Sequence, residues 1–169
     1  MTPAPIIRPA TLADAETITE IYNHAVAHTT AIWNETIVDV QNRKDWITER
    51  QGAGFPILVS ENAEGHVTGY ATYGPWRPHE GYRHTVEHSV YVHPDHQRLG
   101  LGRHLMHALL TKAEEAKVHI MIAGIDASNE GSIRLHEQLG FQASAPLPEV
   151  GTKFGRWLDL VFMWKKIEG

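Results

Sequence analysis

Apolar residues recur along the chain with two periods, one typical of helices and the other typical of strands. Four segments have helical spacing: one after the capping-box-like start at 11–14 that includes residues 18–26, then 39–50, about 101–117, and 128 or 129 to 139. Seven short apolar runs predict strands: 6–8, 56–60, 67–73, 85–92, 119–125, a run from residue 141, and 157–164. Gly74-Pro75 is expected to end the third strand, and Gly140 to end the last helix.

The order of these elements predicts the fold class. Two early strands joined by a turn at 62–65 form a hairpin, and the later part alternates strand, helix, strand, helix and strand. This order implies an α/β (α+β) fold, with one mixed central sheet covered by helices on both faces. No repeat or linker divides the 169 residues, so we expect one domain over 1–169 with its core at about 6–165.

Composition and charge exclude several classes of protein. The net charge is -5 with neutral histidines and no run of Lys or Arg occurs, which argues against nucleic-acid or anionic-membrane partners. The absence of cysteine rules out disulfides, thiolate zinc sites and cysteine nucleophiles. No stretch approaches the roughly 20 apolar residues of a membrane span and residues 1–8 lack a signal sequence, so a soluble, cytoplasmic protein is expected.

The 12 histidines call for a test of metal binding. Two pairs are closely spaced, His93 with His96 and His104 with His107, but no carboxylate–histidine pattern flanks them. Surface histidines are the better interpretation, and no metal site is predicted.

The most informative segment is a strand followed by a glycine-containing loop and a helix. The strand ends at His93-Pro94, and the loop Gln97–Gly102 leads directly into the helix. Two glycines let the backbone approach a ligand and turn its N–H groups toward one point, and the helix N-terminus adds the positive end of its dipole. Such a loop binds a pyrophosphate, with Arg98 and Arg103 at its rim. An ordinary glycine-rich turn is the alternative.

Three phosphate-binding motifs compete for this loop. A Walker loop requires Gly-Lys followed by Ser or Thr, which is absent, and a dinucleotide fingerprint requires a third glycine where Leu105 stands. The remaining pattern is Gln/Arg-x-x-Gly-x-Gly/Ala, and with it the chain resembles the GCN5-related N-acetyltransferase (GNAT) superfamily. The resemblance implies a single-domain GNAT fold and acetyl-CoA as cosubstrate.

The same resemblance implies which residues hold acetyl-CoA. The pyrophosphate would lie on the loop, and backbone N–H groups of the preceding strand would hold the thioester carbonyl and the pantetheine amides. In the superfamily, an Asn at the start of the later helix and a small residue three positions on face the pantetheine arm. The predicted cofactor-binding residues are Ser89, Val90, Tyr91, Val92, Gln97, Arg98, Leu99, Gly100, Leu101, Gly102, Arg103, Asn129 and Ser132.

Longer segments narrow the resemblance. Six of them, among them Thr-Val-Glu-His-Ser-Val-Tyr-Val92, Ser-Ile-Arg-Leu-His136 and Lys-Phe-Gly-Arg-Trp-Leu-Asp159, are similar to the phosphinothricin and methionine sulfoximine acetyltransferases. The phosphinothricin-resistance type carries Lys and Arg in the segment that matches Arg77-Pro78-His79 of this chain. The segment Arg77-Pro78-His79 lacks this pair of basic residues and resembles the methionine sulfoximine branch, which argues against strong phosphinothricin activity.

Acetyl transfer needs an unprotonated amine, because an ammonium has no lone pair, so a base must accept a proton. Glu87 is the first candidate, since it lies mid-strand among apolar residues and matches the base proposed in the resembled family. His136 is the second, as base or as the acid that protonates the CoA thiolate, a role for which the family commonly has Tyr. The alternatives are a salt-bridged strand residue for Glu87 and a hydrogen-bonded helix histidine for His136.

A substrate carboxylate would bind best to Arg77, through its two-pronged guanidinium. Aromatic and loop residues supply the other candidates, although such aromatics are more often core and such loop charges are more often solvated. His88 alternates to the side of the strand opposite Glu87. The predicted substrate contacts are Trp33, Trp76, Arg77, Pro78, His79, Glu87, His88 and Lys153.

These residues predict an enzyme, an acetyl-CoA-dependent N-acetyltransferase. Its expected substrate is the α-amine of methionine sulfoximine, methionine sulfone or phosphinothricin, acetylated by direct attack. Another amine, such as a peptide N-terminus or a polyamine, and a non-catalytic acyl-CoA sensor are the alternatives. The resemblance implies a homodimer, and the apolar segment Trp157–Trp164 is the expected seam.

Overall fold

The computed structural model describes residues 3–168. The α-helices are α1 (Ala15–His28), α2 (Val40–Gly52), α3 (Leu101–Glu115) and α4 (Glu130–Gln138). Short 3-10 turns are η1 (Leu12–Asp14), η2 (Glu80–Tyr82) and η3 (Pro94–His96). The strands are β1 (Ile6–Pro9), β2 (Ile57–Glu61), β3 (Val67–Pro75), β4 (Thr85–Val92), β5 (Ile120–Asp126), β6 (Gln142–Ala143), β7 (Leu147–Lys153) and β8 (Arg156–Lys166).

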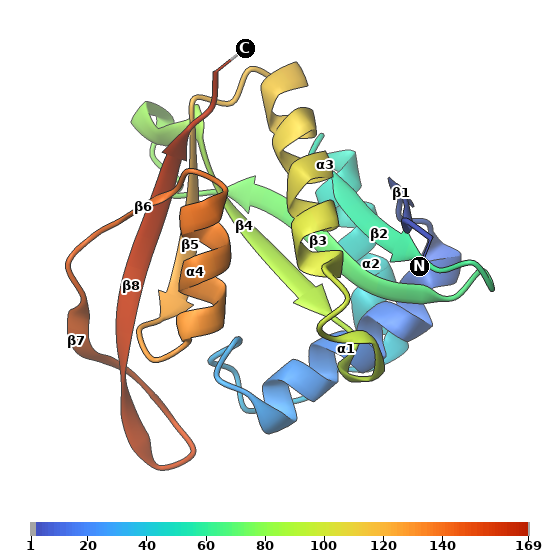
Figure 1. Ribbon diagram of the computed structural model, residues 1–169, viewed down its shortest axis with the longest axis horizontal. Coiled ribbons are helices and arrows are strands. Elements are labelled where there is room, and N and C mark those ends of the chain that lie inside the picture. Colours follow the sequence, from blue (N-terminus) through green and yellow to red (C-terminus); the bar gives the residue numbers. More distant parts are fainter. Residues whose placement is uncertain (1–2, 169) are drawn as a thin grey trace.

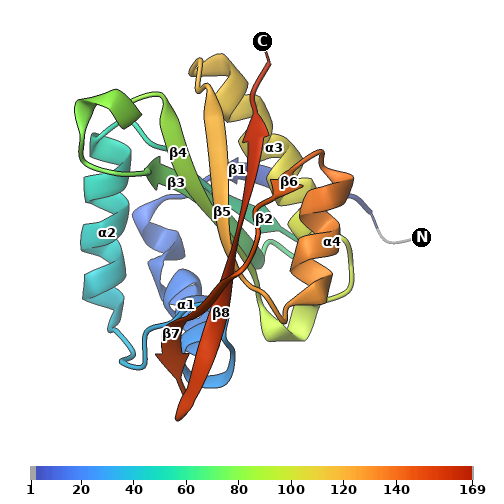
Figure 2. The same ribbon diagram turned by 90° about the vertical axis from the view of Figure 1, so that its left-hand side faces the viewer.

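These strands form a sheet in the order β1-β2-β3-β4-β5-β8-β6, with β7 paired to β8. The β4–β5 pair is parallel and the others are antiparallel. Helices α3 and α4 lie on one face of the sheet, and α1 and α2 on the other (Figures 1 and 2). The predicted mixed sheet with helices on both faces is therefore confirmed. Within residues 3–168, no helix is long and apolar enough to cross a membrane.

Each face of the sheet has its own apolar cluster. On one face, α3 buries Leu105 and Leu109, which lie four positions apart on the same side of the helix. On the other face, Ile18 and Ile21 of α1 pack with Tyr70 of β3. Each such aliphatic side chain contributes about 1.5–3 kcal/mol when fully buried, so the sheet is held from both sides.

Strand β3 is longer than the sequence predicts. Gly74 and Pro75 were expected to end it, yet they pair with Glu87 and Val86 of β4. A proline removes one ladder hydrogen bond, and the sheet tolerates that loss because Pro75 is the last residue of the strand. The extension carries β3 past the candidate base on β4.

Strand β7 was not predicted. It joins β8 through the two-residue turn Phe154-Gly155, in which both residues have positive φ, 53° and 72°. This is the conformation of a type I′ turn, which suits a tight hairpin. The sequence does not indicate this strand, because the segment 147–153 contains Pro148 and Gly151 and has no regular alternation of apolar residues.

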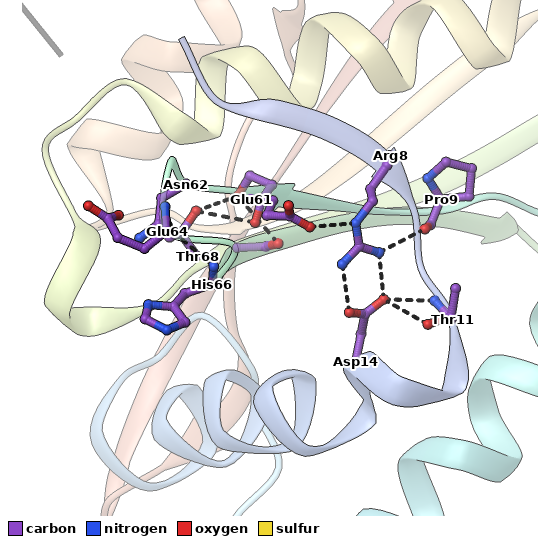
Figure 3. A network of polar contacts seen from close by, with 11 residues as sticks. Arg8, Pro9, Thr11, Asp14, Glu61, Asn62, Glu64, His66 and Thr68 are labelled. Atoms are coloured by element: carbon purple, nitrogen blue, oxygen red, sulfur yellow. Dashed lines mark hydrogen bonds and ion pairs between the residues drawn. The ribbon is translucent and has the colours of Figure 1, made fainter. Parts of the chain in front are cut away.

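Arg8 joins the first strand to the start of α1 and to β2 (Figure 3). Its guanidinium donates to both carboxylate oxygens of Asp14 at 2.9 Å and to Glu61 at 2.8 Å. Asp14 also accepts from the backbone N–H of Thr11, as the capping-box pattern predicts. Burial alone would raise the pKa of Asp14, but the bonds from Arg8 and Thr11 outweigh it and the pKa is lowered. The network fixes the point at which α1 begins.

Candidate active site

The two central parallel strands separate along their second halves. Strands β4 and β5 pair last at Glu87 with Ile122, although β4 continues to Val92 and β5 to Asp126. Figure 1 shows the two strands diverging. Among the described residues, no strand pairs with the edge of β4 that faces β5 beyond Glu87. Its backbone groups can therefore bind a ligand there, as expected for residues 89–92.

A cavity of about 110 Å³ lies between the separated strands. Its lining comes from both strands, the loop after α1 and the first turns of α4: Ala31, His88, Ser89, Val90, Tyr91, Ala123, Gly124, Ile125, Asp126, Asn129, Ser132 and His136. A groove of about 570 Å³ runs along the loop before α3 and is lined by Val90, Val92, Gln97, Arg98, Gly100, Leu101, Gly102, Arg103, Asn129, Gly131, Ser132 and Leu135. The two spaces share Val90, Asn129 and Ser132, so they form one path.

This path brings together the predicted cofactor-binding residues, with one correction. Leu99 is 54% exposed and lines a different groove, together with Pro3 and His104. Its side chain therefore does not face the path between the loop and the strand gap.

The loop before α3 presents backbone N–H groups to the groove. Gly100 is the N-cap residue with φ of +74°, and within the described residues no side chain caps the first turn of this 15-residue helix. The left-handed φ explains the first glycine. A Cβ at Gly102 would lie 3.6 Å from Leu135 across the groove, so the second glycine leaves room for a ligand. Free N–H groups and the positive end of a helix dipole fit a pyrophosphate.

Glu87 lies on the face of the sheet opposite Val86 and His88, its neighbours in β4. Its Oε2 is 3.5 Å from the position that a Cβ on Gly124 would take, next to the cavity. Burial raises the pKa of Glu87, and the charge of Arg77 offsets part of that increase. Within residues 3–168 it forms no ion pair. Such a carboxylate is suited to accept a proton near neutral pH.

His136 lies on the other face, where it bonds to His88. Its Nδ1–H donates to the backbone carbonyl of Ser132 at 2.7 Å, so in the neutral ring Nε2 carries the lone pair. The Nε2–H of His88 donates to that lone pair at 3.0 Å, and the two rings stack at 5.0 Å. Burial lowers the pKa of His136, and burial together with His136 lowers the pKa of His88 to about 3. Both rings are therefore neutral at pH 7.

The histidine pair changes two expectations. His136 has no free lone pair, and it does not share a face with Glu87, so it is not placed to act as the base. His88 is 6% exposed and packs edge-on against Phe141. It borders the cavity from the α4 side, so the structure does not bring it together with Arg77 as a substrate contact.

Trp76 and Arg77 directly follow β3. The Arg77 guanidinium stacks over the Trp76 ring at 4.6 Å, and Trp76 packs edge-on against Phe162 of β8 at 5.2 Å. Arg77 is exposed and forms no ion pair with any residue from 3 to 168, so its charge is available to an anion. Pro78 and His79 lie exposed in the same loop, where the His79 ring packs near Tyr82.

Lys153 is buried at the end of β7, with 1% of its surface exposed. Its ammonium donates to the backbone carbonyls of Thr29 at 2.7 Å and Ile32 at 2.5 Å, and lies 3.5 Å from that of Ala25 in α1. Burial lowers the pKa of Lys153, and the carboxylate of Glu35 offsets part of that decrease. The expected substrate contact is therefore corrected: Lys153 clamps the C-terminal end of α1 and the loop after it.

The loop after α1 is fastened at further points. The Thr30 hydroxyl donates to Asp126 at the end of β5, and the Trp33 indole donates to the Thr30 carbonyl at 2.9 Å. The Trp33 ring lies so close to Gly151 that a Cβ there would be 2.2 Å from it. Trp33 thus packs on β7 and holds the loop, and Ala31 of that loop lines the cavity.

Sequence reasoning missed Ala31, Asp126 and Gly124, which all line the cavity. Ala31 lies two residues before Trp33, and Asp126 lies three residues before Asn129, so each is close to a residue that the motifs did indicate. Gly124 gave a signal of its own, because a glycine inside an apolar strand often marks a close approach of a ligand.

No group of three or more His, Asp or Glu side chains suited to a metal ion occurs within the described part of the chain.

The fold, the strand gap and the loop before α3 define a class of enzyme. The chain belongs to the acetyltransferase (GNAT) family, whose model matches residues 18–141. It is therefore an acetyltransferase.

More specific similarity comes from individual relatives. The chain is 56% identical to the L-methionine sulfoximine/L-methionine sulfone acetyltransferase of Salmonella typhimurium, over 96% of this chain and 94% of the relative. It is 40% identical to the phosphinothricin N-acetyltransferase of Streptomyces viridochromogenes, over 96% and 87%. Among solved structures, YncA of Salmonella typhimurium, described as an acetyltransferase with its cofactor acetyl-CoA, superposes with a TM-score of 0.95. That comparison has 54% identity and covers 99% of this chain and 96% of the other.

Proposed function

We propose that this enzyme transfers the acetyl group of acetyl-CoA to the α-amine of a small amino-acid analogue. Methionine sulfoximine and methionine sulfone are the preferred acceptors, and phosphinothricin is a weaker one. The observation that carries the proposal is Glu87, a half-buried carboxylate without an ion-pair partner among the described residues, beside the strand gap that the pantetheine path enters. The 56% identity to a methionine sulfoximine/sulfone acetyltransferase supports the choice of acceptors.

In this proposal the α3–α4 face of the sheet binds acetyl-CoA, and the opposite face presents the base Glu87 to the acceptor. The N-terminus of α3 and the loop around Gly100 hold the pyrophosphate, and the unpaired backbone of β4 holds the thioester carbonyl and stabilises its developing negative charge. Glu87 accepts a proton from the ammonium of the acceptor. The amine nitrogen then forms a bond to the thioester carbon, the carbon–sulfur bond breaks, and the thiolate takes the second proton that the nitrogen loses.

His136 is proposed as a positioning residue. Its Nδ1–H holds the Ser132 carbonyl and its Nε2 holds His88, so both nitrogens are used within the protein. The pair fixes the wall of the pantetheine path at the first turn of α4. A His136→Gln variant should therefore raise the KM for acetyl-CoA and keep the pH profile of the wild type, whereas loss of a pH-dependent limb would assign proton transfer to His136.

Arg77 is proposed to bind the acceptor carboxylate. It is exposed, free of ion pairs among the described residues, and held over Trp76 at 4.6 Å. The charge of Arg77 also offsets part of the increase that burial causes in the pKa of Glu87, which supports a carboxylate site on the same side as the proposed base.

We further propose a homodimer of one-domain subunits, acting in the cytoplasm. On the β7–β8 hairpin, Val150, Phe154 and Trp157 are 53%, 50% and 67% exposed, a large apolar surface for a monomer to leave in water. Light scattering after gel filtration should give twice the chain mass for the wild type, and Trp157→Glu should shift the equilibrium to monomer. A monomeric wild type at micromolar concentration would contradict the dimer.

The first test is release of free thiol from acetyl-CoA over a panel of amines. The panel contains methionine sulfoximine, methionine sulfone, phosphinothricin, spermidine and a short peptide. Selective turnover of the first two, with weaker turnover of phosphinothricin, would support the proposal. Turnover of spermidine or the peptide alone would replace the acceptor class, and acetyl-CoA binding without turnover of any amine would indicate a sensor.

The second test addresses the base. Glu87→Gln should lower kcat by at least about 100-fold at pH 7, because general base catalysis typically contributes 10²–10⁴-fold. Glu114→Gln, at an exposed position on α3, is the matched control and should behave as the wild type. Near-wild-type turnover of Glu87→Gln at saturating substrate would discard the role of Glu87.

A further inference from the structure

Gly124 leaves an opening in the sheet beside Glu87. It is an exposed residue in the middle of β5 and lines the cavity between the separated strands. A Cβ at this position would lie 3.5 Å from Oε2 of Glu87, 3.6 Å from Cδ1 of Leu160 and 3.9 Å from Cε1 of Phe162. The missing side chain is thus the point where the proposed base, the cavity and two apolar side chains of β8 meet.

This opening lies on the face of the sheet where the acceptor is expected. Gly124 pairs directly with Phe162 across β5 and β8, so both face the same side. Phe162 contacts Trp76, and the Arg77 guanidinium stacks over the Trp76 ring. Helices α1 and α2 pack against β2, β3 and β4, and Figure 1 shows them displaced along the sheet from β5 and β8. The proposed carboxylate site and the opening above Gly124 therefore belong to one accessible surface.

We infer that Gly124 determines acceptor specificity by leaving room for the first carbon atoms of the acceptor side chain. The inference rests on the proposed function and deepens it. When the amine nitrogen of the acceptor donates to Oε2 of Glu87, the α-carbon is one bond from that nitrogen and the β-carbon is two bonds from it. These carbons then reach the space that a Cβ on Gly124 would fill, 3.5 Å from Oε2. Leu160 and Phe162 give that position apolar walls that suit an unbranched methylene chain.

The acceptor is consequently held from two sides. Its carboxylate binds Arg77, and its side chain extends over Gly124 and alongside Leu160. An acceptor branched at the β-carbon places an extra methyl group against the Leu160 and Phe162 walls and is selected against. Linear side chains, as in methionine sulfone, fit this space.

The fold itself tolerates a side chain at this position. The φ of Gly124 is not in the left-handed region, and each neighbour of the added Cβ is at ordinary van der Waals distance. Gly124→Ala should therefore fold as the wild type does, and a change in activity will report the occupied space. Gly52→Ala is the matched control, because a Cβ there would meet nothing within 4 Å and Gly52 ends α2 outside the lining of the cavity.

The experiment measures kcat and KM for Gly124→Ala, Gly124→Val, Gly52→Ala and the wild type. The acceptors are methionine sulfone, alanine and valine, and the acyl donors are acetyl-CoA and propionyl-CoA. We expect the KM for methionine sulfone to rise about tenfold for Ala and about 100-fold for Val, the range that single methylene groups produce in apolar pockets. The KM for alanine should rise less, the KM for acetyl-CoA should not change, and wild-type turnover of valine should be the poorest of the three.

Three results would overturn the inference. Unchanged acceptor constants in folded Gly124→Val would show that the space is not used. A selective loss of propionyl-CoA turnover with unchanged acceptor KM would place the acyl group there instead. Wild-type turnover of methionine sulfone together with equal turnover of valine would remove the selectivity but leave the proposed function intact, whereas a wild type that acetylates no amino acid would refute the proposed function itself.

Discussion

Lys153→Met tests whether the buried ammonium is a clamp or a ligand for substrate. Methionine keeps most of the volume and removes the charge and its donors. The Thr29 and Ile32 carbonyls then lose two hydrogen bonds from a charged donor, each contributing about 1.5–3 kcal/mol, and desolvation of the ammonium offsets part of that loss. We expect a net loss of about 3 kcal/mol, which lowers Tm by roughly 6–12 °C for a chain of this size.

The assay combines thermal unfolding with steady-state kinetics. Lys166→Met is the control, because Lys166 is an exposed lysine on the neighbouring strand β8. The clamp predicts a lower Tm for Lys153→Met. It also predicts a raised acceptor KM, because the loop that the variant releases contains Ala31, which lines the cavity. An unchanged Tm with a large loss of acceptor binding would refute the clamp and restore Lys153 as a direct substrate contact.

Three further predictions follow from single positions. As pH falls through the raised pKa of Glu87, kcat/KM should decrease, and Glu87→Gln should lack this pH-dependent limb. Ionising a carboxylate of raised pKa lowers the stability of the folded protein above that pKa. The same variant should therefore be more stable than the wild type at pH 8 and not at pH 4, as denaturant titrations at the two pH values would show. Gly100→Ala should raise the KM for acetyl-CoA up to about tenfold, because a left-handed residue costs about 1–2 kcal/mol, and unchanged kinetics would contradict the role of the loop. Gly151→Ala should lower stability by about 1–3 kcal/mol, since its Cβ would overlap the rigid Trp33 ring, and an unchanged denaturation midpoint would show that the ring moves freely.

Features set by a few consecutive residues were predictable from the sequence. The side chain of Asp39 caps α2 by accepting from the Asn42 N–H, and that of Asn129 caps α4 by accepting from Ser132. The left-handed Gly100 follows from the same kind of local rule, because few other residues adopt that backbone. Local signals of this kind identify where helices begin and where the candidate phosphate-binding loop lies.

Features that depend on distant contacts were not predictable. Lys153 stands in a Gly-Thr-Lys-Phe-Gly segment, which has the composition of a solvated turn, and its burial depends on carbonyls more than 120 positions away. The Nε2–Nε2 bond of His88 to His136 joins a strand to a helix 48 positions later. Residue type and spacing carry no information on such a pairing, so the roles of both histidines could only be assigned after their hydrogen bonds were known.

The separation of β4 from β5 explains why the proposed base Glu87 and the histidine pair cannot exchange roles. Alternation along β4 directs Glu87 to one face and His88 to the other, and the gap that opens just after Glu87 gives both faces access to one cavity. The proposed cofactor path enters from the α3–α4 face, so in this proposal the acceptor approaches from the face of Glu87, where its nitrogen can attack the thioester without displacing the pantetheine arm. A change of acceptor therefore calls for changes on β5 and β8 around Gly124, whereas the loop at Gly100 and the first turn of α4 can stay the same.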